Sequence, residues 1–100
     1  MDNAELVRMY KSSIQRVKCS LVELNSEASF IAINILEKRL AVWIGSKSSQ
    51  VDAALAQKIG ADIVSKEFRL STSTNPIPVH NESKLEKVGF LQSFNNLMLV

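Results

Sequence analysis

The segment that most constrains the fold is Leu40–Ser49 (LAVWIGSKSS), which is followed by a long stretch with helical periodicity. Its first five residues are apolar and include the only tryptophan, so they predict a buried strand that ends at Gly45. Ser49 suits the N-cap position of the next helix. Asp52, three residues later, completes a capping-box-like pair and favours the positive end of the helix dipole. A strand leading directly into a long helix predicts packed layers of α and β structure.

The chain upstream of this segment predicts further strands. Ser29–Leu36 (SFIAINIL) is almost wholly apolar, which is typical of a central strand buried on both faces. Glu37–Arg39 is a polar connection, so Ser29–Leu36 and Leu40–Ile44 are predicted to form a hairpin. Ser13–Ser20 alternates between apolar and polar residues and predicts a half-exposed strand. Met1–Tyr10 fits either a short helix or a frayed arm, and the pattern does not decide between them.

The predicted long helix runs from Val51 to about Phe68 and has two distinct faces. The first face is continuous and apolar and is expected to cover the sheet; it consists of Ala53, Ala56, Ile59, Gly60, Ile63 and Val64. The second is apolar in its first turn and polar afterwards, and it consists of Val51, Ala54, Leu55, Lys58, Asp62 and Ser65. The second face is either a solvated surface or a docking surface for a partner.

The chain after the helix predicts the remaining elements. Leu70–Asn75 is a polar loop, and Pro76–Pro78 stiffens the backbone into an extended conformation before an edge strand at Val79–Leu85. Glu86–Phe94 has helical spacing and predicts a short second helix, and Leu97–Val100 is an apolar tail. We therefore expect one α+β domain over residues 1–100, with its core at about residues 13–94 and a mixed sheet with a helix on each face.

The composition excludes several classes of protein. A formal charge of +2 over 100 residues is too small and too evenly spread for a nucleic-acid-binding surface. Cys19 is the only cysteine, so an intrachain disulfide and a multi-cysteine zinc site are excluded, and a reducing compartment is favoured. No run approaches the roughly eighteen apolar residues of a membrane helix, and Met1 does not begin a signal peptide. We expect a soluble cytoplasmic domain without a nucleic-acid or membrane partner.

Few residues suggest catalysis. His80 is the only histidine and lies on a predicted surface strand, far from the one cysteine, so a structural or exposed role is favoured. Gly45–Ser49 precedes a helix as a phosphate-binding loop does, but it has one glycine where a P-loop needs two. None of the acidic residues has the spacing of an EF-hand loop. We therefore expect a binding protein and not an enzyme.

Several segments, in this order, resemble one known family. They are SLVELNS at 20–26, Phe30-Ile31, VWIGSKSS at 42–49, the Ala-rich helix, and FLQSF at 90–94 with Glu86 before it. Together they cover Val17 to Phe94 and resemble a domain of the gelsolin/villin family. The Trp-x-Gly-x-x-x-Ser turn is the most specific of these segments.

The resemblance implies both a fold and a function. The fold is a five- to six-stranded mixed sheet between a long helix, roughly parallel to the strands, and a short helix. The function is actin binding in the cytoplasm and cytoskeleton, with the long helix docked in the hydrophobic cleft between two actin subdomains. Such a domain modulates filament assembly by monomer binding or end capping. Carried over by position, the actin-binding residues are those of the second helical face, namely Val51, Ala54, Leu55, Lys58, Asp62 and Ser65.

Two departures from the family pattern concern calcium. The family's calcium-binding domains have Gly-Asp before the first central strand, where this chain has Glu27-Ala28. The family's helix glutamate ligand aligns with the shorter Asp52. Because calcium takes six to eight oxygen ligands, the loss of one charged ligand weakens a site severely. We expect a calcium-independent domain without a cofactor, with Glu27 and Asp52 as the remaining candidate metal ligands.

A second interpretation is a structural interaction module of the same fold that does not bind actin. Gelsolin-like domains of vesicle-coat proteins pack against neighbouring domains in this way. The polar second half of the outward helical face favours this interpretation. Its partners would be neighbouring gelsolin-like domains or, through the apolar tail Leu97–Val100, a second copy of the chain.

Overall fold

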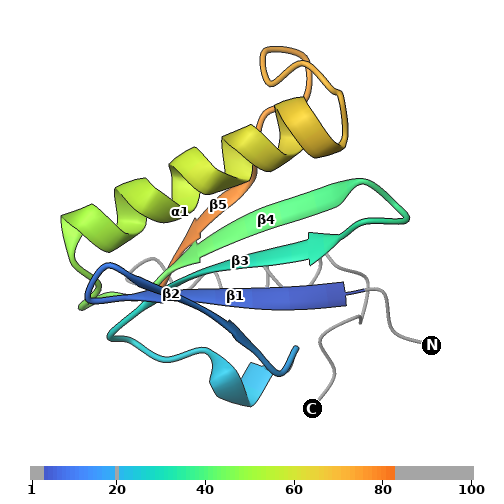
Figure 1. The fold of residues 1–100 in the computed structure, drawn as a ribbon. Coiled ribbons are helices and arrows are strands. Elements are labelled where there is room, and N and C mark those ends of the chain that lie inside the picture. Colours follow the sequence, from blue (N-terminus) through green and yellow to red (C-terminus); the bar gives the residue numbers. More distant parts are fainter. Residues whose placement is uncertain (1–3, 20, 83–100) are drawn as a thin grey trace.

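A computed structural model describes residues 4–19 and 21–82 of the chain (Figure 1). Within these residues, five strands form one sheet in the order β2-β1-β3-β4-β5; the pairs β2–β1, β1–β3 and β3–β4 are antiparallel, and the pair β4–β5 is parallel. The strands are β1 (Ala4–Tyr10), β2 (Ser13–Val17), β3 (Ser29–Asn34), β4 (Arg39–Ile44) and β5 (Val79–Asn81). The helices are η1 (Leu21–Glu23, 3-10), α1 (Gln50–Asp62) and its π-helical continuation η2 (Ile63–Glu67). This arrangement confirms an α+β fold with a five-stranded mixed sheet and one long helix.

The first ten residues, for which the sequence pattern left a helix or an arm open, contain strand β1. It lies between β2 and β3, and both of its edges are hydrogen-bonded. Leu6 and Met9 are fully buried on opposite faces of the sheet. The sequence does not reveal β1 as a strand because polar residues interrupt its apolar positions. Two of these polar side chains contact side chains of β2: Glu5 forms an ion pair with Arg16 at 3.0 Å, and Arg8 donates a hydrogen bond to Gln15.

The hairpin of β3 and β4 is confirmed, but the predicted end of its first strand at Leu36 is wrong. β3 ends at Asn34, a buried residue whose side-chain oxygen accepts the backbone N–H of Glu37 at 3.0 Å. Lys38 has a left-handed backbone, with φ of 54°. The asparagine thus closes the turn early, which leaves Ile35 and Leu36 exposed at the tip of the hairpin.

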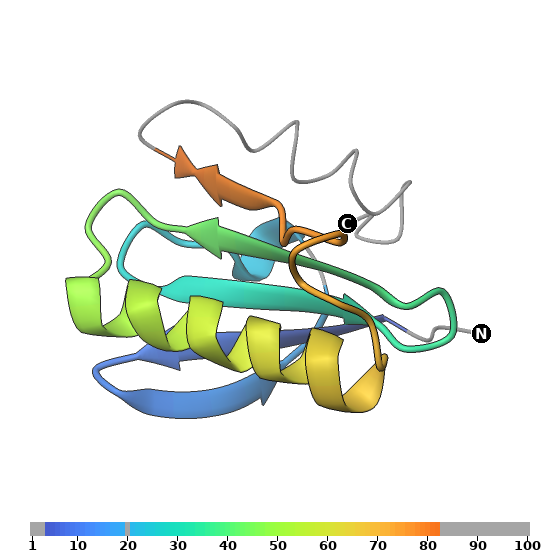
Figure 2. The same ribbon diagram turned by 90° about the horizontal axis from the view of Figure 1, so that it is seen from above.

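The sheet carries one hydrophobic cluster on each face. α1 lies along one face, roughly parallel to the strands, and packs over β1, β3 and β4 (Figures 1 and 2). The cluster on this helix side contains Met9, Ile31, Ile33, Leu40, Val42, Ala56, Val64 and Phe68. The opposite cluster contains Leu6, Leu24, Ala28, Phe30, Ala32, Ala41 and Trp43. Trp43 is fully buried there and packs against Phe30 at a ring-centroid distance of 5.8 Å.

The long helix extends over the predicted span. All six residues predicted to face the sheet are buried or half-buried, with Ala56, Gly60 and Val64 at the centre of the contact. A Cβ at Gly60 would lie 3.1 Å from Leu40 Cδ2, so helix and sheet approach closely there, as predicted. The helix stops where Leu70 N–H reaches back to the Val64 carbonyl at 3.0 Å and Arg69 adopts a left-handed φ of 58°.

The return to the sheet is shorter than predicted. After the prolines, β5 covers only Val79–Asn81, in parallel register with Val42–Ile44. The predicted short helix Glu86–Phe94 and the apolar tail Leu97–Val100 lie outside the described residues. Within residues 4–19 and 21–82, no helix combines the length and the apolar character needed to cross a membrane.

Candidate functional site

The candidate site is the outer face of α1, the helical surface turned away from the sheet. It consists of Val51, Ala54, Leu55, Lys58, Asp62 and Ser65. Five of these residues are exposed, and Val51 at the N-terminal end has 63% of its surface accessible. The structure therefore brings the six predicted residues onto one continuous strip along the helix, opposite the buried positions Ala56, Gly60 and Val64.

Leu55 differs from the other five residues. It is half-buried and packs against the helix-side core cluster, so it lies at the border between the core and the outer face. A change at Leu55 therefore affects folding as well as any binding at the surface. Val51, with most of its side chain in solvent, is the cleaner probe of the outer face.

The C-terminal half of the outer face carries two opposite charges. Lys58 and Asp62 are four residues apart on the exposed side, yet no ion pair joins them or links either one to another residue in the part of the chain that the structure describes. A lysine that precedes its acidic partner is the less favourable order on a helix. Both side chains are exposed and can contact a partner.

The N-terminus of α1 is fixed to the β1–β2 turn by Asp52. The Ser49 hydroxyl accepts the Asp52 backbone N–H at 3.0 Å, which confirms the predicted N-cap. The carboxylate of Asp52 does not complete a capping box. It is 2% exposed, and its two oxygens accept the backbone N–H groups of Lys11 at 2.9 Å and Ser12 at 2.8 Å. Asp52 thus holds the start of the outer face in place.

These hydrogen bonds also bear on the two candidate metal ligands. Each Asp52 oxygen accepts one backbone N–H, which leaves fewer of its lone pairs for a cation. Glu27 is exposed, and its backbone N–H donates to the Asn25 side chain at 2.9 Å. Over residues 4–19 and 21–82, no three acidic, histidine or cysteine side chains are grouped as metal ligands.

A second anchor, which the sequence analysis missed, lies at the end of β4. The Glu82 carboxylate accepts the Ser26 hydroxyl at 2.9 Å and the Ser46 backbone N–H at 2.8 Å. Gly45 N–H donates to the Ala28 carbonyl at 3.0 Å in the same turn. Only the parallel placement of β5 brings Glu82 to this turn, and no local sequence signal indicates that placement. Together these bonds set the direction in which the chain enters α1.

Comparisons with known proteins identify the fold. No protein-family model matches the sequence, and a search of curated proteins finds no match. Among the solved structures with a similar fold are two complexes with rabbit actin. The Thorarchaeota 2DGel3/rabbit actin complex matches with a TM-score of 0.72 and 14% identity over 93% of this chain. The Thorarchaeota ProGel/rabbit actin complex matches with a TM-score of 0.60 and 17% identity over 89% of this chain.

These similarities show that the fold is gelsolin-like, as the sequence segments predicted. The match spans 96% of the ProGel chain but only 47% of the 2DGel3 chain, so this chain corresponds to about half the length of the latter.

Proposed function

We propose that this gelsolin-like domain binds actin through the outer face of α1, as a binding module and not as an enzyme. One observation carries the proposal: the fold matches gelsolin-like chains that were crystallised with rabbit actin. The proposal extends to filament assembly, which the domain would modulate by binding monomers or capping filament ends. It places the protein in the cytoplasm, at the cytoskeleton.

The geometry of α1 supports this proposal. The outer face presents an exposed apolar residue, Val51, at its start and the exposed, oppositely charged Lys58 and Asp62 further along. An amphipathic helix that enters an apolar groove uses such anchors spaced by one turn. The Asp52 carboxylate accepts the backbone N–H groups of Lys11 and Ser12 and so anchors the first turn of α1 to the β1–β2 turn. A preformed surface loses less conformational entropy on binding.

The proposed binding is independent of calcium. The carboxylate that aligns with the family's helix ligand is Asp52, and its oxygens already accept two backbone N–H groups. Actin binding is therefore expected to be the same with calcium and with a chelator.

The second candidate function is a structural interaction module of the same fold that leaves actin unbound. The exposed Lys58, Asp62 and Ser65 favour it, because they make the C-terminal half of the outer face polar. A pyrene-actin polymerisation assay separates the two candidates. Actin binding requires a change in polymerisation that grows with the concentration of the domain, whereas the structural module leaves polymerisation unchanged.

Replacement of Val51 by aspartate is expected to weaken actin binding at least about tenfold. Burial of a valine side chain in a partner contributes roughly 1.5–3 kcal/mol, and a charge in an apolar cleft costs more. The variant should fold normally, because residue 51 lies in the first helical turn, where a carboxylate interacts favourably with the helix dipole. Co-sedimentation and monomer titration measure the effect.

The matched control is Gln50→Asp. It places the same charge in the same helical turn at an exposed residue outside the outer face. Affinity should stay within about twofold of the parent chain for this control. Equal affinities for Val51→Asp and the parent would show that the outer face is not the contact surface.

A further inference from the structure

The edge strand β2 carries an exposed apolar side chain, Ile14, with 53% of its surface accessible. Its register partner in β1 is Met9, which belongs to the hydrophobic cluster beneath α1. Directly opposed residues of an antiparallel pair have their side chains on the same face of the sheet. Ile14 therefore lies on the face that α1 covers, at the edge of the sheet on one side of the helix (Figure 2).

The helical period shows which flank of α1 is turned towards this edge. Gly60 lies over β4, because a Cβ there would lie 3.1 Å from Leu40 Cδ2, whereas the Asp52 carboxylate contacts the β1–β2 turn. Viewed along the helix axis, Asp52 lies about 80° away from Gly60. Leu55 and Val51 lie about 60° and about 100° beyond Asp52 in the same direction. Both residues are therefore on the flank of α1 that faces β2.

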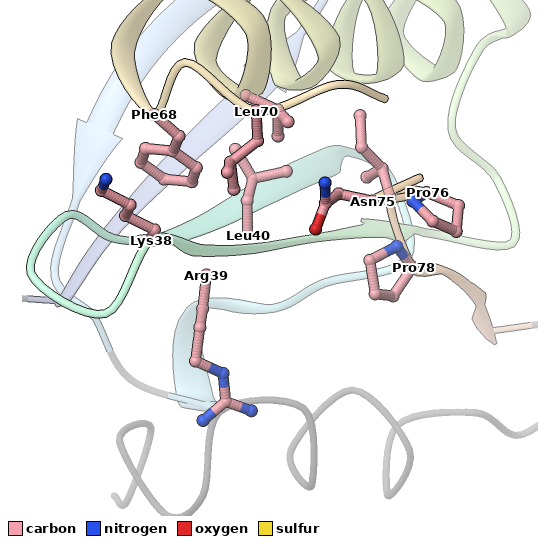
Figure 3. A pocket seen from close by; sticks show the side chains of 10 residues that line it. Lys38, Arg39, Leu40, Phe68, Leu70, Asn75, Pro76 and Pro78 are labelled. Atoms are coloured by element: carbon pink, nitrogen blue, oxygen red, sulfur yellow. The ribbon is translucent and has the colours of Figure 1, made fainter. Parts of the chain in front are cut away.

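The opposite flank of α1 is covered by the chain itself. Ile77 lies 3.7 Å from the position of a Cβ at Gly60, in the segment that leads from η2 back to β5. A pocket of about 270 Å³ remains there, lined by Leu40, Phe68 and Leu70 among others (Figure 3). On the β2 flank, by contrast, residues 13–16 are all exposed. The β2 flank is therefore the one on which a partner can contact the helix and the sheet edge together.

The hydrogen bonds of Asp52 fix the helix relative to this edge. Its carboxylate accepts the N–H groups of Lys11 at 2.9 Å and Ser12 at 2.8 Å, and it is almost fully buried. Val51 precedes Asp52 in the helix, and Ile14 follows Ser12 by two residues in β2. The two exposed apolar side chains thus flank one anchored junction, so they are positioned for a common partner before it binds.

We propose that actin contacts this domain on its β2 flank, against Ile14 as well as Val51 and Leu55. The inference rests on the proposed actin binding and adds the edge strand to the contact surface. Stable interfaces include roughly 20–30 residues on each side, whereas the outer face of α1 has six residues and is polar in its second half. The three apolar side chains form the centre of the contact. Arg16, paired with Glu5 at 3.0 Å on the same face of the sheet, belongs to its polar rim.

Titration of Ile14→Asp with monomeric rabbit actin tests the inference. Affinity should fall at least about tenfold, because the variant places a charge in an apolar contact. Ser13→Asp is the matched control, since it places the same charge one residue away on the opposite face of the strand. It should bind within about twofold of the parent chain.

A second variant protects the test against loss of folding. Ile14→Thr keeps a β-branched residue, which suits a strand, and should still weaken binding at least about threefold because it removes apolar surface. Circular dichroism of each variant should match that of the parent. Unchanged affinity of both Ile14 variants, with Val51→Asp still weakened, would overturn the contact at β2 and leave binding through α1 intact. A parent chain that does not bind actin would instead contradict the proposed function and this inference with it.

Discussion

Replacement of Gly45 by alanine is expected to destabilise the domain by about 3 kcal/mol or more. A Cβ at this position would lie 2.4 Å from the Ser26 carbonyl oxygen and 2.6 Å from the Ala28 carbonyl oxygen. Both atoms belong to the backbone, which cannot move without breaking the bonds that Gly45 and Lys47 make to it. For a domain of this size, the loss lowers Tm by more than about 10 °C, measured by thermal unfolding.

Gly60→Ala is the matched control for this prediction. The nearest atom to its Cβ is the end of the Leu40 side chain at 3.1 Å, which can shift, and alanine favours the helix by about 1 kcal/mol over glycine. Stability should therefore change by less than about 1 kcal/mol. A Gly45→Ala variant as stable as Gly60→Ala would contradict a steric role of Gly45 in this turn.

Replacement of Asp52 by alanine is the second large effect, with an expected loss of about 2–3 kcal/mol. The variant removes the acceptor of the backbone N–H groups of Lys11 and Ser12 and leaves these donors without their charged partner. Asp52→Asn keeps the shape and one strong acceptor, so it should recover part of the loss. Urea unfolding measures both variants.

Hydrogen exchange identifies the cause of this destabilisation. The amides of Lys11 and Ser12 should exchange faster in Asp52→Ala under conditions where the sheet amides of β3 remain protected. If these two amides keep the protection that they have in the parent chain, the carboxylate does not hold the turn. The variant would then act only through the end of α1.

The elements near the Trp43 turn could be predicted because their local signals agree. The apolar strand before Gly45, the serine N-cap and the two helical faces all appear in the structure where the sequence placed them. The six residues of the outer face could be placed because the helical period alone determines which side chains share a side. Their role in binding stays a prediction.

The remaining features depend on contacts between distant parts of the chain. β1 is a strand because β2 and β3 pair with both of its edges, which the polar residues Glu5 and Arg8 conceal in the sequence. The role of Asp52 in holding residues 11 and 12 spans about forty positions. β3 ends early because the Asn34 side chain closes the turn. In the sequence this single asparagine is surrounded by apolar residues, and their pattern predicts that the strand continues to Leu36.

Titration of the domain with monomeric rabbit actin tests the central proposal most directly. We expect a saturable one-to-one isotherm that is the same with calcium and with a chelator, and that weakens at least about tenfold for Val51→Asp but not for Gln50→Asp. A flat isotherm at actin concentrations up to about 100 µM would contradict actin binding by this domain.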